Sequence, residues 1–208
     1  MRSKSSAASS ESKRVKERAR QVVTTNIAAA QAVLQQLAGL EAQVEAASAI
    51  IAEAFLSGHK LLACGNGGSA ADASHLTTEF VARYDRERRA YPAISLASHG
   101  GDLTAIGNDY SFADLFARQV QAYGSPGDAL AVFTTTGNSE NVFRALLAAK
   151  DQKLKTIAFL GRDGGDCAGL ADVELLVAGK ATARIQEGHK FLLHTICELV
   201  DEKLLTAE

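Results

Sequence analysis

The sequence predicts an α/β protein in which a five-stranded parallel sheet lies between two layers of helices, an αβα sandwich. Five short apolar runs alternate with segments of helical composition, and glycine, proline and other turn residues separate them. Buried strands that alternate with helices are typical of βαβ units and of a parallel sheet covered on both faces. The predicted strands are Leu61–Cys64, Ala93–Leu96, Ala129–Phe133, Thr156–Leu160 and Val173–Val177.

A pair of helices is predicted before the first strand, over residues 15–57. Ala, Leu, Gln and Glu dominate this region, and its apolar residues recur at helical spacing. Gly39 is expected to divide the two helices and Gly58 to end the second. Residues 1–12 are polar and are predicted to form a disordered tail, which leaves a single domain over residues 13–208. The helical pair can pack on a partner subunit or cover one face of its own domain, and the sequence leaves both possibilities open.

The composition excludes several classes of protein. Of the 208 residues, 47% are apolar and 22% charged, a balance typical of a globular domain. A net charge of −2 and the lack of Trp give no basic or aromatic surface for nucleic acid, and no apolar run is long enough to span a membrane. The three cysteines form no CxxC pair, and the N-terminus lacks the apolar core of a secretory signal. We therefore expect a cytoplasmic protein.

A glycine-rich loop, GNGGSA, follows the strand Leu61–Cys64. It matches the dinucleotide pattern G-x-G-x-x-G/A, but that site also needs an acidic residue at the end of the second strand. The second strand is followed by Ala-Ser-His-Gly, so a dinucleotide site is not predicted. The loop can bind an anion or a sugar hydroxyl through its backbone N–H groups and the helix N-terminus, or it can be a tight turn with Ser69 as N-cap. Its candidate binding residues are Asn66, Gly67, Gly68 and Ser69.

A second loop, TTTGNS, follows the strand Ala129–Phe133 and precedes a predicted helix that starts at Glu140. Hydroxyl groups and free N–H groups at a helix N-terminus suit the three oxygens of a phosphate monoester. Helix capping alone requires fewer hydroxyls, so a phosphate site is favoured. Its candidate residues are Thr134, Thr135, Thr136 and Ser139.

A histidine and a glutamate, His75 and Glu79, share one face of the helix predicted after the first loop. Such a pair is more often a surface feature than a metal or catalytic site. The C-terminal helix, predicted over residues 184–205, carries Gln186 and His194, and a histidine in such a helix is more often structural than a ligand. Between these helices in the sequence, the pair Asn108-Asp109 can form an exposed turn, or it can lie in a strand-end loop, where it would suit sugar hydroxyls.

Four motifs in this order, CGNGGSAADASH, GNDYSF, TTTGNS and ARIQEGH, resemble the sugar isomerase (SIS) family, and within it the phosphoheptose isomerases. The resemblance extends over residues 20–205. It implies the SIS fold, a homotetramer with active sites between subunits, and a sugar phosphate substrate. It also implies Zn²⁺ bound by His75, Glu79, Gln186 and His194. The substrate contacts that it implies are Asn66, Gly67, Gly68, Asn108, Asp109, Thr134, Thr135, Thr136, Ser139 and Gln186.

The reaction that the resemblance implies converts sedoheptulose 7-phosphate to D-glycero-D-manno-heptose 7-phosphate through an enediol. Glu79 is predicted to move the proton between C1 and C2, and His194 to handle the oxygen-bound proton. Gln186 and His194 lie eight residues apart, about 12 Å along an ideal helix, so they share a metal only at an irregular helix start or across a subunit boundary. Ala183 stands where some family members have an acid, so a role of that acid is absent here. A non-catalytic SIS-type binding module and an isomerase of another ketose phosphate are the alternatives.

Overall fold

A five-stranded, all-parallel sheet forms the centre of the structure, a computed structural model that describes residues 3–207. Its strands lie in the order β2-β1-β3-β4-β5, and each predicted run coincides with one of them. The strands are β1 (Leu61–Gly65), β2 (Ala93–Ser95), β3 (Ala129–Thr134), β4 (Lys155–Gly161) and β5 (Val173–Val177). The strand order reverses between β1 and β3, so their carboxyl ends flank the crevice where ligands bind in open α/β sheets.

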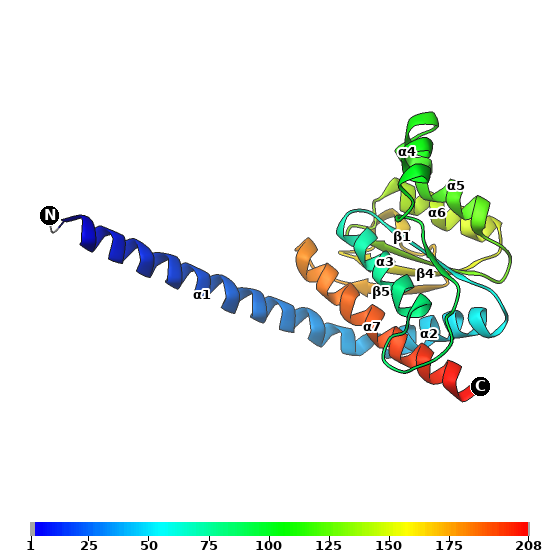
Figure 1. Cartoon of the computed structure of the whole chain (residues 1–208), viewed down its shortest axis with the longest axis horizontal. Helices are drawn as coiled ribbons and strands as arrows, with labels where there is room; N and C mark the ends of the chain where they lie inside the picture. The colour runs from blue at the N-terminus through cyan, green and yellow to red at the C-terminus, as the bar shows by residue number, and fades with distance from the viewer. Residues whose placement is uncertain (1–2, 208) are drawn as a thin grey trace.

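Helices cover both faces of this sheet, as the sequence predicts (Figure 1). The helices that follow the N-terminal pair are α3 (Gly68–Val81), α4 (Gly100–Asp109), α5 (Leu115–Tyr123), α6 (Glu140–Asp151) and α7 (Thr182–Ala207). Alternate side chains of β1 enter different cores, because successive residues of a strand point to opposite faces. Leu61 and Ala63 pack with α3 and α7, whereas Leu62 and Cys64 pack with α5 and α6, and all four are fully buried.

The N-terminal helical pair is observed, and Gly39 lies at its break. A 3-10 turn over Ala38–Leu40 separates α1 (Ser3–Leu37) from α2 (Glu41–Leu56). Of the predicted disordered tail over residues 1–12, residues 1 and 2 lie outside the described residues, and residues 3–12 belong to α1 in this structure. No Pro or Gly interrupts the sequence from Ser3 to Gly39, so nothing in the segment stops the helix.

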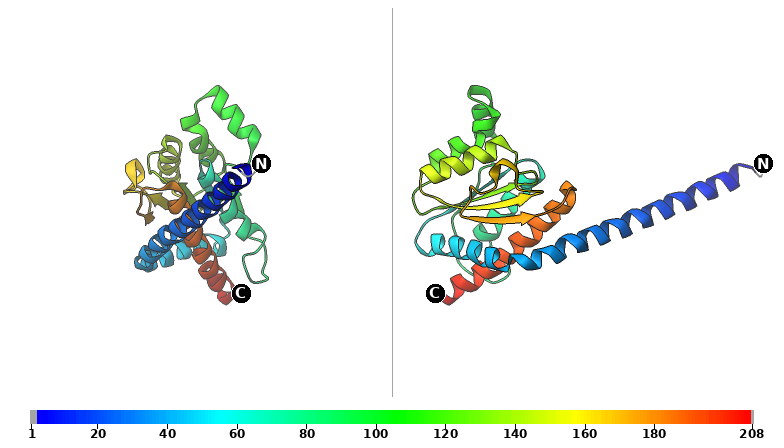
Figure 2. Two further views of the ribbon diagram at one scale, coloured as in Figure 1. Left: turned by 90° about the vertical axis from the view of Figure 1, so that its left-hand side faces the viewer. Right: turned by 180° about the vertical axis from the view of Figure 1, so that it is seen from behind.

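Most of α1 extends away from the domain (Figures 1 and 2). Its C-terminal end is held by the domain, since Val33 and Leu37 are buried and Gln36 donates a hydrogen bond to the carbonyl of Ala178. Further out, large apolar side chains are exposed, namely Val15, Val22, Val23, Ile27 and Leu34. Although α1 is long, neither it nor another helix within residues 3–207 is apolar enough over a sufficient length to cross a membrane.

Candidate active site

The two candidate loops lie side by side at the carboxyl ends of β1 and β3. β1 and β3 are paired along their length, up to Gly65 opposite Phe133. Beyond them, the side chains of Asn66 and Asn141 exchange two amide hydrogen bonds, of 2.8 and 2.9 Å. Asn141 is buried in the first turn of α6, so this exchange fixes the first loop against the helix that follows the second. The sequence had not singled out Asn141, whose partner lies 75 positions away.

The glycines of the first loop allow a tight turn and a close approach of α7. Gly67 has φ +55° and is the N-cap of α3, so Ser69 is not the N-cap that the tight-turn alternative requires. A Cβ on Gly68 would lie 2.2 Å from the Nε2 atom of Gln186, and one on Gly65 would lie 2.7 Å from the carbonyl oxygen of Ser69. The loop is therefore packed against Gln186 in a way that larger residues would prevent.

The second loop presents hydroxyl groups at the N-terminus of α6. Thr134 accepts a hydrogen bond from the N–H of Gly137 at 3.1 Å, and its hydroxyl lies 3.3 Å from that of Ser139. Ser139 has the backbone conformation of the N-cap, but its hydroxyl makes no capping hydrogen bond. Thr135, Thr136 and Ser139 are half-buried. Because the hydroxyls are not consumed in capping α6, this geometry favours the phosphate-binding interpretation over the capping one.

Three of the predicted metal and acid–base residues come together where α3 packs against α7. The Nε2 atom of His75 lies 2.7 Å from Oε1 of Glu79 and 3.2 Å from Nε2 of His194. The candidate ligand atoms of these three residues all lie within 4.8 Å of one another, and all three side chains are partly accessible. Two imidazoles and one carboxylate suit zinc, and three protein ligands leave a position open for substrate. The residues of this cluster, which we call the His–Glu–His cluster, therefore fit a catalytic metal.

The environment of His194 keeps its ring neutral. Burial lowers the pKa of His194 below its ordinary value, and the nearby His75 and Lys190 lower it further, against an opposing effect of Glu79. A neutral imidazole can accept a proton or bind a metal, whereas a protonated one can do neither. The ring of Tyr84 lies 5.8 Å from that of His194, measured between centroids.

Two charged residues that the sequence analysis had not proposed lie next to the cluster. Lys190 places its Nζ atom 2.8 Å from Nδ1 of His75 and 2.8 Å from Oδ1 of Asp72. Asp72 is buried, with 7% of its side chain exposed. Its position three residues before His75 on α3 was a signal available in the sequence, and Lys190 lies four residues before His194 on α7.

The structure does not bring Gln186 to the cluster within one chain. α7 is helical from Thr182, so Gln186 lies in regular helix, about 12 Å along the axis from His194. Its amide instead contacts Gly68 at the start of α3. At this position Gln186 suits contact with a substrate at the first loop. Metal binding by Gln186 stays a prediction, and it would require the Gln186 side chain of a second copy of the chain to reach this cluster.

The prediction that Asn108-Asp109 lies in a strand-end loop is wrong. Both residues belong to the last turn of α4, which stands out from the sandwich beside α5 (Figure 1). Asn108 donates a hydrogen bond to the carboxylate of Asp109 at 2.8 Å, and both residues are exposed. The glycines at 100, 101 and 107 suggest a loop locally, but the segment is helical. Within this chain α4 packs on α5, on the opposite side of the sheet from the His–Glu–His cluster.

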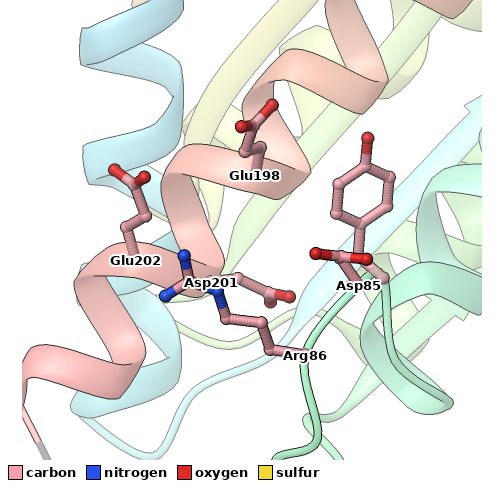
Figure 3. A pocket seen from close by; sticks show the side chains of 6 residues that line it. Asp85, Arg86, Glu198, Asp201 and Glu202 are labelled. Carbon is pink, nitrogen blue, oxygen red and sulfur yellow. The ribbon is translucent and has the colours of Figure 1, made fainter.

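A cavity of about 350 Å³ lies beside the C-terminal part of α7, where Glu198, Asp201 and Glu202 line it (Figure 3). Burial and the neighbouring Glu198 raise the pKa of Tyr84 at its edge, so that phenol stays protonated. The cavity carries four carboxylates and one arginine, so its charge disfavours an anionic ligand. Its lining residues are Tyr84, Asp85, Arg86, Glu198, Asp201 and Glu202.

The order of the parallel strands and the helices on both faces of the sheet are those of a SIS-domain fold. The family model described as SIS domain matches residues 26–161. The chain is 44% identical over 172 residues to the phosphoheptose isomerase of Alteromonas mediterranea, covering 81% of this chain and 87% of the relative. It is 47% identical over 165 residues to that of Citrifermentans bemidjiense, covering 79% and 86%.

Solved structures agree with this match. The phosphoheptose isomerase GmhA from Neisseria gonorrhoeae superposes with a TM-score of 0.83 at 38% identity, covering 88% of this chain and 98% of that one. A phosphoheptose isomerase from Francisella tularensis gives a TM-score of 0.85 at 32% identity with the same coverage. The chain belongs to the phosphoheptose isomerase family of SIS-domain proteins.

Proposed function

We propose that the protein is an aldose–ketose isomerase that converts sedoheptulose 7-phosphate to D-glycero-D-manno-heptose 7-phosphate, a heptose precursor. The observation that carries this proposal is the His–Glu–His cluster, which unites acid–base and metal-binding groups from two distant segments in a phosphoheptose isomerase homologue. A non-catalytic SIS module would have no need of this cluster.

The proton transfer is assigned to the two residues whose geometry suits it. Glu79 takes the proton from one of the two carbons C1 and C2 and returns it to the other, through an enediol. Its Oε1 atom faces His75, which leaves the second carboxylate oxygen for the substrate. His194, held neutral by burial, accepts and returns the oxygen-bound proton. His75, Glu79 and His194 would hold a zinc ion. When bound, it would polarise the carbonyl and stabilise negative charge on the enediolate oxygens.

The phosphate end of the substrate is assigned to the second loop. Thr134, Thr135, Thr136 and Ser139 offer hydroxyls there, with the N-terminus of α6 behind them. Asn66, Gly67, Gly68, Ser69 and Gln186 form the adjoining surface for the sugar hydroxyls. Fixing the phosphate restricts the motion of the reacting carbons and so raises the effective concentration of the catalytic groups.

A second copy of the chain is proposed to complete the site. Glu79 lies ten positions after Ser69 on α3, about 15 Å farther along the helix, so one chain holds the two ends of the site well apart. Asn108 and Asp109, on the protruding α4, would reach a neighbour's site more readily than their own. The exposed apolar side chains of α1 would pack in such an assembly, and we propose a homotetramer. The three buried free cysteines support a location in the cytoplasm.

The test is an isomerase assay on the full-length protein with zinc supplied. Sedoheptulose 7-phosphate is the substrate, other ketose phosphates are run in parallel, and aldose formation is followed. Glu79→Gln and His194→Gln are expected to lower kcat by about 10²- to 10⁴-fold, the usual contribution of an acid–base residue. Glu87→Gln is the matched control, since this side chain is 91% exposed and lies outside the cluster.

Four results would contradict parts of the proposal. No turnover of any ketose phosphate by the wild type would remove the isomerase assignment. Turnover of a different ketose phosphate alone would change the substrate and leave the chemistry intact. Full activity of both cluster variants would show that the acid and base lie elsewhere. Light scattering on the same samples would contradict the tetramer if it gave the mass of one chain.

A further inference from the structure

Lys190 contacts the Nδ1 atom of His75. A histidine that binds a metal through its other ring nitrogen normally donates the N–H at this position to an acceptor. The Nζ atom of Lys190 lies 2.8 Å from Nδ1 of His75, while Nε2 of the same ring faces Glu79 and His194. Lys190 is one-third exposed and reaches this position from α7, with Asp72 on its other side at 2.8 Å. The ammonium group therefore links a buried carboxylate to a proposed metal ligand.

This arrangement is incompatible with a metal on His75. A metal at the centre of the His–Glu–His cluster would bind Nε2 of His75, and the neutral ring would then carry its proton on Nδ1. Metal-bound histidines donate that second N–H to a carboxylate, carbonyl or water. An ammonium group has three donors and no acceptor, so Lys190 cannot stay in its present place. Its positive charge also opposes a divalent cation nearby.

Asp72 provides the acceptor that this exchange needs. It lies three residues before His75 on α3, and both side chains contact the same Nζ atom. Its Oδ2 atom is buried and has no hydrogen-bond partner among residues 3–207. When Lys190 withdraws, the carboxylate of Asp72, which contacts the same Nζ atom as His75, can accept the Nδ1–H of His75.

We propose that Lys190 holds His75 in a metal-free arrangement, and that metal loading requires Lys190 to leave Nδ1 of His75 to Asp72. Lys190 is thus a positioning residue that lowers the affinity of the site for divalent metal. This inference rests on the metal site of the proposed function. The inference adds that Lys190 competes with the metal for His75, so that the bound metal can exchange.

The test measures the affinity for zinc of the full-length protein by competition with a chromophoric chelator. Lys190→Gln supplies an acceptor for Nδ1–H without charge, and it is expected to bind zinc about 10- to 100-fold more tightly than the wild type, the scale on which outer partners of metal-bound histidines act. Lys190→Arg keeps the charge and the donors, so its affinity should not exceed that of the wild type. Lys203→Met is the control, because it removes a lysine of the same helix that is about as exposed as Lys190, at 36%, and pairs with Glu45.

The outcomes separate this inference from the metal site itself. His194→Gln is expected to weaken zinc binding and so to locate the ion at the cluster. If it does, and Lys190→Gln binds zinc no more tightly than the wild type, the role of Lys190 is overturned and the metal site stands. Tighter binding by Lys190→Arg would also overturn it. If the wild type binds no zinc, the metal site fails and this inference fails with it. Circular dichroism of each variant verifies that it is folded.

Discussion

A buried ion pair, Arg88–Asp201, holds the C-terminal end of the helix that carries His75 and Glu79. Arg88 is fully buried and its Nε lies 2.6 Å from Oδ1 of Asp201, whose side chain is 4% exposed. The same guanidinium donates hydrogen bonds to the carbonyls of Glu79 and Phe80 at 2.7 and 3.1 Å, at the end of α3. These carbonyls have no continuing helix to donate to them, so the arginine takes that place.

Replacing Arg88 with methionine is expected to destabilise the protein by about 4 kcal/mol. Removal of one partner from a buried pair typically costs about 3–5 kcal/mol, because the remaining charge is left uncompensated. Solvent screening does not reduce this value, since neither side chain is accessible. The double variant Arg88→Met/Asp201→Leu removes both charges and is expected to recover about half of the loss, because the carbonyl of Glu79 loses the arginine as donor while that of Phe80 keeps the N–H of Tyr91.

Urea unfolding of metal-free protein at one fixed concentration measures these changes. The matched control is Arg144→Met, which breaks an exposed pair with Asp114 in which Arg144 is 43% exposed, and it should cost less than about 1 kcal/mol. If Arg88→Met cost no more than Arg144→Met, the pair would not be the support that we describe. A double variant that loses as much as the sum of Arg88→Met and Asp201→Leu would refute the coupling between the two charges.

Three further predictions concern the second loop, acid stability and the metal. Gly137→Ala is expected to raise KM for the sugar phosphate in steady-state kinetics, because Gly137 has φ +72° and a Cβ there would lie 1.8 Å from the carbonyl oxygen of Gly164; an unchanged KM would contradict this role. Burial lowers the pKa of His189 below its ordinary 6.5, so its contribution to stability is present above about pH 6.5 and is lost as the pH falls toward the folded-state pKa. His189→Gln should therefore flatten the acid side of the stability curve measured by urea unfolding, and an equally steep curve would refute this. Removal of divalent metal with a chelator should lower isomerase activity, and added zinc should restore it, whereas activity that survives chelation would count against the metal site.

The strands and the two loops could be predicted because their signals are local. Each strand is a short apolar run between turn residues, and each loop follows directly on its strand. The sheet brings the loops together without further information, because β1 and β3 are neighbours and parallel. The prediction for Asn108-Asp109 was wrong because the local signal was misleading there. Three glycines gave α4 the local composition of a loop, and the helix that forms there could not be seen in the sequence.

Contacts between distant residues could not be predicted in this way. The spacing of Asp72 from His75 and of Lys190 from His194 places each charge beside a cluster residue, but it does not pair the two charges. Asp72 and Lys190 are ordinary charged residues of two helices, and only the packing of α3 on α7 makes them partners. Arg88 and Asp201 are likewise 113 positions apart. An isolated charge in a helix is normally solvent-exposed, so a sequence argument assigns it to the surface unless the fold is known.

The packing of α3 on α7 explains why the chemistry depends on both helices at once. Their contacts follow one another in the same direction along each helix, from Gly68 with Gln186, through Asp72 with Lys190, to His75 with His194. On α7 these contacts are spaced by four residues, close to one helical turn, so all of them face α3. The first contact adjoins the glycine-rich first loop, the last belongs to the proposed metal site, and Lys190 lies between them. A change in how α7 lies along α3 would therefore alter the sugar contacts and the acid–base groups together. Lys190 lies at the middle contact, where its Nζ atom reaches His75 and Asp72. In our proposal it can therefore control the metal without touching the first loop, which a residue at either end of the row could not do.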